Sequence, residues 1–156
     1  MRPDLIYVDT SAFYALMDRA DHYHQSAKAL WPFLLEDAIS LRTSNYVVSE
    51  TLNLIQNRLG FKAACVWYKD ILGILDVHWV DQAIHQRAYE LWMSLGRHKY
   101  SLVDCISYVI MHRNDIETVF SFKSRFAKQG FQLLTQPLGP KRTGQGGAID
   151  RTISDS

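Results

Sequence analysis

The sequence predicts an α/β domain in which a mostly parallel sheet is covered by helices on both faces. Short apolar runs, rich in β-branched and aromatic residues, alternate with longer segments in which apolar residues recur at helical spacing. Ser, Asp and Gly residues stand at the boundaries of these segments, where helices commonly begin and end. A length of 156 residues with 47% hydrophobic content is sufficient for one domain with a full core.

The first expected strand is the run "LIYV", residues 5–8, whose composition is typical of a strand buried on both faces. A helix is expected from Thr10, because Phe13 and Met17 recur at helical spacing and Thr10 or Ser11 can cap its first turn. The other expected elements are a helix at 24–37 with Pro32 as an interruption or a new start, a strand at 38–44, helices at 45–59 and 61–74, a strand at 75–80, helices at 82–95 and 102–114, and strands at 118–122 and 131–134.

Polar residues and glycines define the ends of the later helices. Ser44, Asp81 and Ser101 each precede a helical segment, and their side-chain oxygens can accept hydrogen bonds from its first free N–H groups. Gly60 and Gly96 follow helical segments, where the absence of a side chain eases the change of backbone direction. These five residues therefore predict where three helices begin and two end.

Composition narrows the class of protein. A formal net charge of +1 gives no sign of a polybasic arm for nucleic acid. No stretch reaches the roughly 18 apolar residues of a membrane helix, and the N-terminus lacks the order of a signal peptide, so no membrane association is expected. Cys65 and Cys105 match no zinc spacing and are expected to be buried free thiols in a reducing cytoplasm.

Residues 137–156 are rich in Gly, Pro, Ser and charge, so we expect a domain at 1–136 and a disordered tail.

Three acidic residues stand where a structural role competes with a functional one. Asp9 ends the first strand, at the sheet edge where ligands bind in parallel α/β folds, and it is alternatively a helix cap. Glu50 lies at the edge of the apolar stripe of its helix, and it is alternatively a solvated surface residue. Asp104 lies in the first turn of an otherwise apolar helix, where it alternatively completes a capping box with Ser101.

Taken together, the three carboxylates suggest a metal site with oxygen ligands. Carboxylates that are brought together repel one another, and a hard divalent cation such as Mg²⁺ or Mn²⁺ removes that repulsion. The chemistry expected of such a site is the attack of a metal-activated water on a phosphodiester.

Four segments of the chain occur in the order found in PIN-domain proteins, and they are "YVDTSAFYALMDRADHYHQSA", "TSNYVVSETLNLI", "YSLVDCISYVIM" and "VFSFKSRFAKQGF". The chain thus resembles the PIN-domain family, and within it the VapC-type toxin ribonucleases, over about residues 4–135. The resemblance implies a three-layer α/β/α sandwich, Mg²⁺- or Mn²⁺-dependent cleavage of RNA, an antitoxin partner and a homodimer. It also implies that Asp9, Glu50 and Asp104 are catalytic metal ligands, with Ser11 as a supporting hydroxyl.

The last of these segments departs from the family pattern. Ser121 and Phe126 keep its frame, but Lys123 stands where the family has a fourth acid. Three arrangements remain open: Lys123 points outward and three acids hold one metal, Lys123 occupies a metal position and pairs with an acid, or Lys123 contacts RNA phosphate or the leaving oxygen. Ser121 and Lys123 are therefore candidate supporting residues, and Arg125 is a candidate for contact with the RNA backbone.

Two main functions are compatible with these residues. The first is a metal-dependent endoribonuclease, the toxin of a type II toxin–antitoxin pair. The second is a degenerate PIN domain that binds RNA or a protein partner without cleavage, which the Lys123 substitution favours. A DNA-directed nuclease or a phosphatase-like acid cluster is a third, weaker possibility. The helices also carry more aromatic residues than one small core requires, which suggests a dimer face or a groove for an antitoxin helix, and these are Trp67, Tyr68, Tyr89 and Trp92.

Overall fold

The computed structural model describes residues 3–36, 38–96 and 99–135. The strands are β1 (Leu5–Val8), β2 (Ser40–Ser44), β3 (Leu75–His78), β4 (Thr118–Phe120) and β5 (Gln132–Leu133). The helices are α1 (Thr10–Met17), α2 (His24–Leu34), α3 (Asn45–Leu59), α4 (Phe61–Ile71), α5 (Gln82–Leu95), α6 (Leu102–Arg113) and α7 (Arg125–Lys128), with the 3-10 helix η1 (Leu72–Ile74) after α4.

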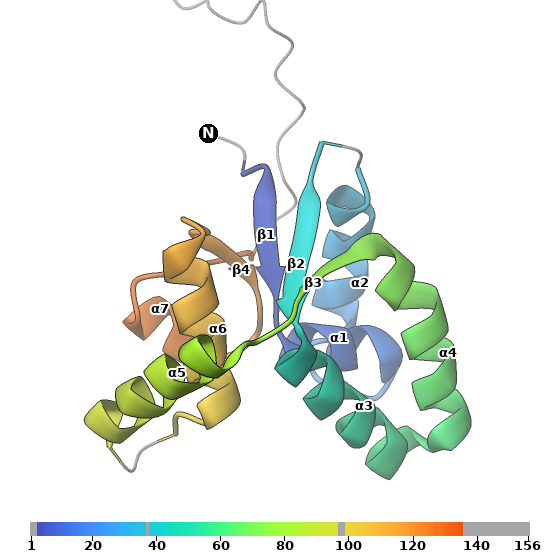
Figure 1. The fold of residues 1–156 in the computed structure, drawn as a ribbon. Helices are drawn as coiled ribbons and strands as arrows, with labels where there is room; N and C mark the ends of the chain where they lie inside the picture. Colours follow the sequence, from blue (N-terminus) through green and yellow to red (C-terminus); the bar gives the residue numbers. More distant parts are fainter. Residues whose placement is uncertain (1–2, 37, 97–98, 136–156) are drawn as a thin grey trace, which may run out of the picture.

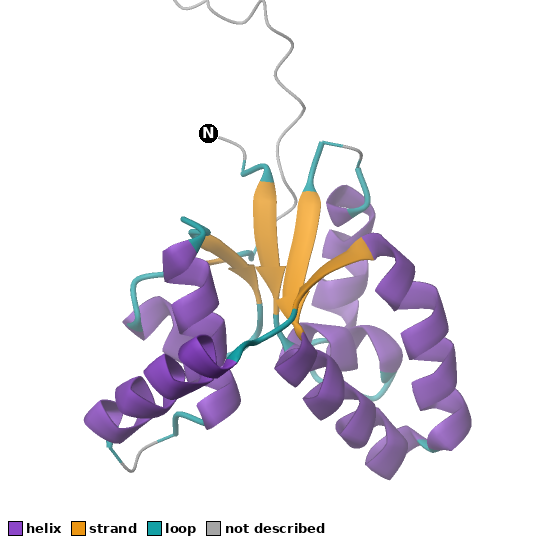
Figure 2. Cartoon of the chain, in the orientation of Figure 1, coloured by secondary structure: helices purple, strands orange, loops and turns teal. Residues whose placement is uncertain are grey.

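The five strands form one parallel sheet in the order β3-β2-β1-β4-β5. Helices α1 to α4 lie on one side of the strands and α5 to α7 on the other (Figures 1 and 2). The predicted α/β sandwich with a parallel central sheet is therefore confirmed. Because all five strands run in the same direction, their carboxyl ends share one edge of the sheet, and ligands bind at this edge in open α/β folds.

The central position of β1 places its carboxyl end between two neighbours. Ile6 is in register with Leu41 of β2 on one side and with Thr118 of β4 on the other. The backbone N–H of Asp9 donates to Phe120 O at 3.1 Å, so the pairing with β4 extends one residue beyond the strand. The start of α1 is thereby fixed against the segment that follows β4.

Most of the expected helix caps are present. Ser44, Asp81 and Ser101 each accept a hydrogen bond from the backbone N–H three residues on, as predicted. The expectation that Thr10 or Ser11 caps the first helix is wrong, because Asp9 is the N-cap and its carboxylate accepts from the backbone N–H of Ser11. A carboxylate in extended backbone geometry at the strand end is well placed for that role, and Thr10 is already within the helix.

Two other details differ from the sequence-based expectation. Pro32 lies inside α2, near its end, and neither interrupts nor restarts the helix. Cys65 is exposed and Cys105 is buried, so the prediction of a buried thiol holds only for Cys105. Cys65 lies on the outer side of α4, whose buried face consists of Ala64 and Trp67. The expected tail at 137–156 lies outside the described residues. None of the described helices is long and apolar enough to span a membrane.

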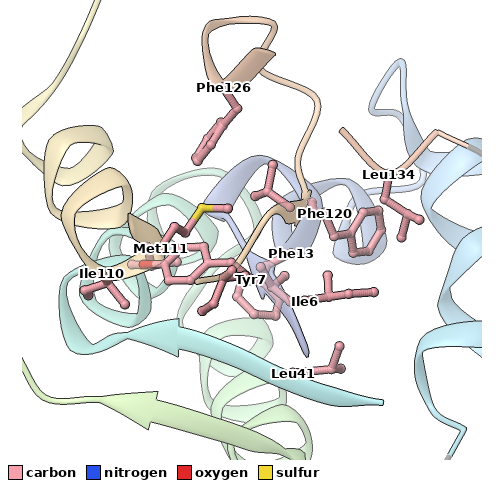
Figure 3. Close-up of a cluster of buried hydrophobic side chains, with 14 of the residues drawn as sticks. Ile6, Tyr7, Phe13, Leu41, Ile110, Met111, Phe120, Phe126 and Leu134 are labelled. Atoms are coloured by element: carbon pink, nitrogen blue, oxygen red, sulfur yellow. The ribbon is translucent and has the colours of Figure 1, made fainter. Parts of the chain in front are cut away.

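The core between the sheet and the helices is built from apolar and aromatic side chains, several of which are drawn in Figure 3. Tyr7 is fully buried in it, and the hydroxyl of Ser107 on α6 lies 2.9 Å from the Tyr7 hydroxyl. Burial in apolar surroundings raises the pKa of Tyr7 well above its ordinary value, so this side chain is neutral. The hydrogen bond ties α6, which carries Asp104, to the central strand.

We expect Ser107→Ala to lower the free energy of unfolding by about 1 kcal/mol, because the buried Tyr7 hydroxyl loses one hydrogen-bond partner. Urea unfolding followed by circular dichroism measures this change. Ser94→Ala, at an exposed position on α5, is the matched control and should change stability by less than about 0.5 kcal/mol. Equal losses in the two variants would contradict the structural role of the hydrogen bond.

Candidate active site

Asp9 is fixed in place by the two hydroxyl groups nearest to it. Its carboxylate is almost fully buried at the carboxyl end of β1. Oδ2 accepts hydrogen bonds from Ser11 Oγ at 2.9 Å and from Ser121 Oγ at 3.0 Å, in addition to the capping bond from Ser11 N. Oδ1 is buried and has no hydrogen-bond partner among the described residues. One oxygen is therefore saturated, whereas the other is a buried acceptor without a donor.

The same two hydroxyls position the segment after β4. Ser11 Oγ accepts from the backbone N–H of Phe122 at 3.0 Å, and Ser121 Oγ accepts from the backbone N–H of Lys123 at 3.1 Å. The two hydroxyl oxygens lie 3.1 Å apart. Serine residues that are 110 positions apart in the chain thus join the start of α1 to the segment that carries Lys123. The expectation that Ser11 and Ser121 support the site agrees with this geometry, although their effect on activity stays a prediction.

Asp104 is held by the start of its own helix. It lies in the first turn of α6, and its Oδ2 accepts from the backbone N–H of Ser101 at 3.0 Å, which completes the capping box. The side chain is fully buried. Arg125 Nε lies 3.4 Å from the same oxygen. The structural role foreseen for Asp104 is therefore real, and it leaves Oδ1 free to face the centre of the site.

Glu50 approaches from α3 and is the most accessible of the three acids. Its side chain is 36% exposed. Burial raises the pKa of the Glu50 carboxyl, and the nearby Lys123 only partly offsets this effect, so the pKa lies above its ordinary value. Glu50 is therefore not the solvated surface residue of the alternative interpretation, because its carboxylate faces the other two acids and the ammonium of Lys123.

Lys123 lies among the three carboxylates. Its Nζ is 3.2 Å from Asp104 Oδ1, 3.7 Å from Asp9 Oδ2 and 4.0 Å from Glu50 Oε1. Burial lowers the pKa of the ammonium, but the three negative charges raise it by more, so the net pKa lies above the ordinary value. The side chain is therefore positively charged at neutral pH. Of the three arrangements left open by the sequence, the structure has the one in which Lys123 pairs with the acids.

The structure thus brings together Asp9, Glu50 and Asp104, as the sequence suggested, and it places Lys123 among them in one of the three arrangements left open. It also adds one contact that the sequence did not suggest. Arg125 was expected to face RNA phosphate, but its Nε contacts Asp104. The only signal in the sequence for this contact was that Arg125 stands two residues after Lys123. Such spacing does not reveal whether the side chain of a cationic residue points into the site. The catalytic role of Asp9, Glu50 and Asp104 and the supporting role of Lys123 stay predictions.

The carboxylate oxygens of the site are the type of ligand that a hard divalent cation prefers. Three carboxylates from three elements supply oxygen ligands, and the buried Asp9 Oδ1 lacks a hydrogen-bond donor among the described residues. The arrangement, however, includes the ammonium of Lys123. Within residues 3–36, 38–96 and 99–135, no three His, Cys, Asp or Glu side chains are grouped as a ready metal site. Asp9, Glu50 and Asp104 fit a metal by chemistry, with Lys123 lying among them.

A pocket of about 450 Å³ adjoins Glu50 on the side of α3. It is lined by amide and hydroxyl side chains, by one aromatic ring and by a valine of α6, and these residues are Asn45, Tyr46, Ser49, Glu50, Asn53 and Val103. The Tyr46 hydroxyl is hydrogen-bonded to His85 Nδ1 at 2.6 Å, which fixes the ring at the wall of the pocket. The pocket therefore offers space for a small ligand next to the Glu50 carboxylate.

The aromatic residues singled out in the sequence do not share one environment. Trp67 is buried and packs edge-on against Phe13 in the core, so it is not part of a surface. Tyr68, Tyr89 and Trp92 are exposed. A second pocket, of about 370 Å³, lies between α3, α4 and the end of β3, and its lining includes Leu52, Tyr68, Leu72 and the exposed Trp79.

Comparison with known proteins agrees with this fold. The chain matches the family model of the PIN domain over residues 6–132. It is also 31% identical over 128 residues to the 23S rRNA-specific endonuclease VapC20 of Mycobacterium tuberculosis, an alignment that covers 81% of this chain and 95% of the relative.

Comparison with solved structures gives the same fold. The crystal structure of Mycobacterium tuberculosis VapC20, described as a sarcin–ricin loop cleaving toxin, superposes with a TM-score of 0.74 at 31% identity and covers 81% of this chain and 95% of its own. VapBC2 from Rickettsia felis, bound to a DNA fragment from its promoter, gives a TM-score of 0.63 at 12% identity and covers 86% and 99%. FitAcB from Neisseria gonorrhoeae gives 0.60 at 16% identity and covers 83% and 96%. At such identities the last two support the fold alone.

Proposed function

Because the chain belongs to the PIN-domain family, we propose that it is an endoribonuclease, the toxin of a type II toxin–antitoxin pair. The observation that carries this proposal is the convergence of Asp9, Glu50 and Asp104, from β1, α3 and α6, at the carboxyl edge of the sheet around one point. Metal-assisted hydrolysis of a phosphodiester uses oxygen ligands that the protein holds in a fixed arrangement within a shaped cavity.

We propose structured ribosomal RNA as the substrate class. The relative that is 31% identical over most of this chain is a 23S rRNA-specific endonuclease, and its solved structure is described as that of a sarcin–ricin loop cleaving toxin. The pocket beside Glu50 provides room for one nucleotide adjacent to the scissile bond. Its amide side chains offer both donors and acceptors to the edge of a base.

The residues of the site divide the work of the reaction. Asp9, Glu50 and Asp104 would hold a divalent cation, Mg²⁺ or Mn²⁺, which when bound supplies an activated water and offsets charge on the phosphate. Ser11 and Ser121 orient Asp9 and leave its Oδ1 available. The capping bond from Ser101 keeps Asp104 from turning away. The protein thus fixes two acids by hydrogen bonds and leaves Glu50 more exposed at the edge.

The test is incubation of a sarcin–ricin loop hairpin RNA with the purified protein, with Mn²⁺ or Mg²⁺ and with EDTA in parallel. We expect a discrete cut in the presence of the metal and none in EDTA. A DNA hairpin of the same sequence should remain intact. Persistent cleavage in EDTA would refute the metal requirement. Equal cleavage of the RNA hairpin and the DNA hairpin would refute the preference for RNA.

A second candidate is favoured by one observation, the position of Lys123 among the acids. A PIN domain whose carboxylates are neutralised internally can bind RNA without cutting it. Tight binding of the hairpin in a filter or fluorescence assay, with intact RNA after prolonged incubation with Mn²⁺, would support this alternative over the ribonuclease.

The proposed partners are an antitoxin and a second copy of the chain, in the cytoplasm. The exposed Trp79 and Tyr68, beside the groove of about 370 Å³, are the apolar surface that supports a protein partner. The mass in solution, measured by light scattering after size exclusion, tests the homodimer, and co-expression with the adjacent reading frame tests the antitoxin. A monomeric mass at micromolar concentration would contradict the dimer.

We expect Asn53→Ala to raise the KM for hairpin RNA about fivefold with little change in kcat, because about 1 kcal/mol of hydrogen bonding in the pocket beside Glu50 is lost. Asn57→Ala is the matched control, since it removes the same side chain one turn further along α3, outside the pocket lining. Initial rates over a range of RNA concentrations measure both constants. Equal KM values for the two variants would remove this pocket from the substrate path.

A further inference from the structure

Lys123 contacts all three acids at once, at the position where the resemblance to the PIN-domain family implies a fourth acid. Its Nζ lies within 4.0 Å of an oxygen of Asp9, Glu50 and Asp104. The side chain is only 20% exposed. We propose that the Lys123 ammonium is the internal counterion of this carboxylate centre, and that a divalent cation binds only by displacing it. The inference rests on the proposed function in one respect, namely that these three acids bind the metal.

Electrostatics makes the two cations mutually exclusive. Three carboxylates that face one another require a positive charge among them, and the ammonium supplies it in the metal-free protein. A divalent ion bound to the same oxygens would lie close to the ammonium, and the repulsion would be strong in this largely buried place. The lysine therefore lowers the metal affinity of the centre, in addition to removing a potential ligand.

The contacts of Lys123 also indicate that it can be displaced. Its backbone is fixed by the bond from its N–H to Ser121 Oγ, whereas its ammonium is held by one hydrogen bond, to Asp104 Oδ1 at 3.2 Å, and by the charges of Asp9 and Glu50. The lysine stem is flexible and the side chain is 20% exposed, so the ammonium can turn outward while the backbone stays in place. Arg125 stays with Asp104 Oδ2 and compensates part of the remaining charge. The centre then alternates between an ammonium-filled and a metal-filled state.

The experiment is a titration of the RNA-free protein with Mn²⁺, followed by calorimetry and by electron paramagnetic resonance of free Mn²⁺. Lys123→Met removes the charge and keeps the length, and we expect it to bind Mn²⁺ at least about tenfold more tightly than the wild type. Lys123→Asp, which also adds a ligand, should bind more tightly still. Lys123→Arg keeps the cation and should stay as weak as the wild type. Lys62→Met, at an exposed position on α4, is the control for net charge and should change the affinity by less than about twofold.

Thermal unfolding gives a second readout that does not depend on RNA cleavage. In EDTA, Lys123→Asp should melt below the wild type because four acids then lack their counterion, and Mn²⁺ should raise its melting temperature more than that of the wild type. Lys123→Met serves as the second variant if Lys123→Asp does not fold. Equal Mn²⁺ affinity for the wild type, Lys123→Met and Lys123→Arg would overturn the inference.

The outcomes separate this inference from the proposed function. If Lys123→Met binds Mn²⁺ tightly but no form of the protein cuts RNA, the ribonuclease proposal fails and the counterion role stands. If the wild type cuts RNA with Mn²⁺ and its affinity equals that of Lys123→Met, the counterion role fails and the ribonuclease stands. If no variant binds Mn²⁺ at all, both the inference and the metal requirement are overturned.

Discussion

Asp9→Asn is expected to lower the rate of RNA cleavage by at least about 100-fold, because even the loss of an outer-shell partner typically costs 10–100-fold in metal affinity or activity. Asp9 is central in three respects: it ends the central strand, it is buried, and its Oδ1 is a buried oxygen without a hydrogen-bond donor among the described residues. Initial rates of cleavage of the hairpin RNA in Mn²⁺ measure the effect.

The substitution is chosen so that the fold is preserved. Asparagine has the shape of aspartate, and its amide oxygen can still accept from Ser11 and Ser121, so the join between α1 and the segment after β4 should remain. Circular dichroism and the urea midpoint check this. Asp70→Asn, at an exposed position on α4, is the matched control and should cut at the wild-type rate. A rate for Asp9→Asn within about threefold of the wild type would remove Asp9 from the reaction, given the size of the usual effect.

Local signals in the sequence were sufficient for the fold. The run at residues 5–8 has no charged residue and is a strand in the centre of the sheet. Ser44, Asp81 and Ser101 mark helix starts correctly because capping depends only on residues within one turn of the cap. The first helix is the exception, since three consecutive candidates compete and the extended backbone at the strand end selects Asp9.

The candidate site was predictable in position but not in detail. The convergence of Asp9, Glu50 and Asp104 could be predicted from the parallel strands and from the family likeness. Both indicate at which edge of the sheet the elements that carry these acids begin or end. The direction of a long side chain does not follow from either. Lys123 turns inward because three carboxylates are already assembled there by β1, α3 and α6, which is a tertiary effect without a local signature. The contact of Arg125 with Asp104 arises in the same way.

The exposure of Cys65 illustrates the same limit at the surface. Its neighbours Ala64 and Trp67 are buried, and a run of apolar residues in α4 suggested that the thiol would be buried as well. A helix only one face of which packs on the domain exposes part of such a run. Which apolar residues face outward depends on the rotation of the helix, and the periodicity in a segment this short leaves that rotation uncertain by a residue.

Asp104→Ala is expected to lower the free energy of unfolding by about 2–4 kcal/mol in the absence of metal. The buried carboxylate accepts from Ser101 N and faces both Lys123 and Arg125, so its loss breaks the capping box and leaves two cations without their closest anion. Removal of one partner of a fully buried pair typically costs about 3–5 kcal/mol, and the partial exposure of the two cations reduces that figure. Urea unfolding in EDTA measures the change.

Two further variants separate the contributions of Asp104. Asp104→Asn keeps an acceptor for Ser101 N but removes the charge, so its loss of stability should be smaller than that of Asp104→Ala, and the difference reports the capping bond. Asp70→Ala, at an exposed position, should change stability by less than about 0.5 kcal/mol. An Asp104→Ala protein as stable as the wild type would mean that relief of repulsion among the acids outweighs the two lost ion pairs. In that case Lys123 would not stabilise the centre, and the assignment of its ammonium as the counterion of the three acids would have to be abandoned along with this prediction.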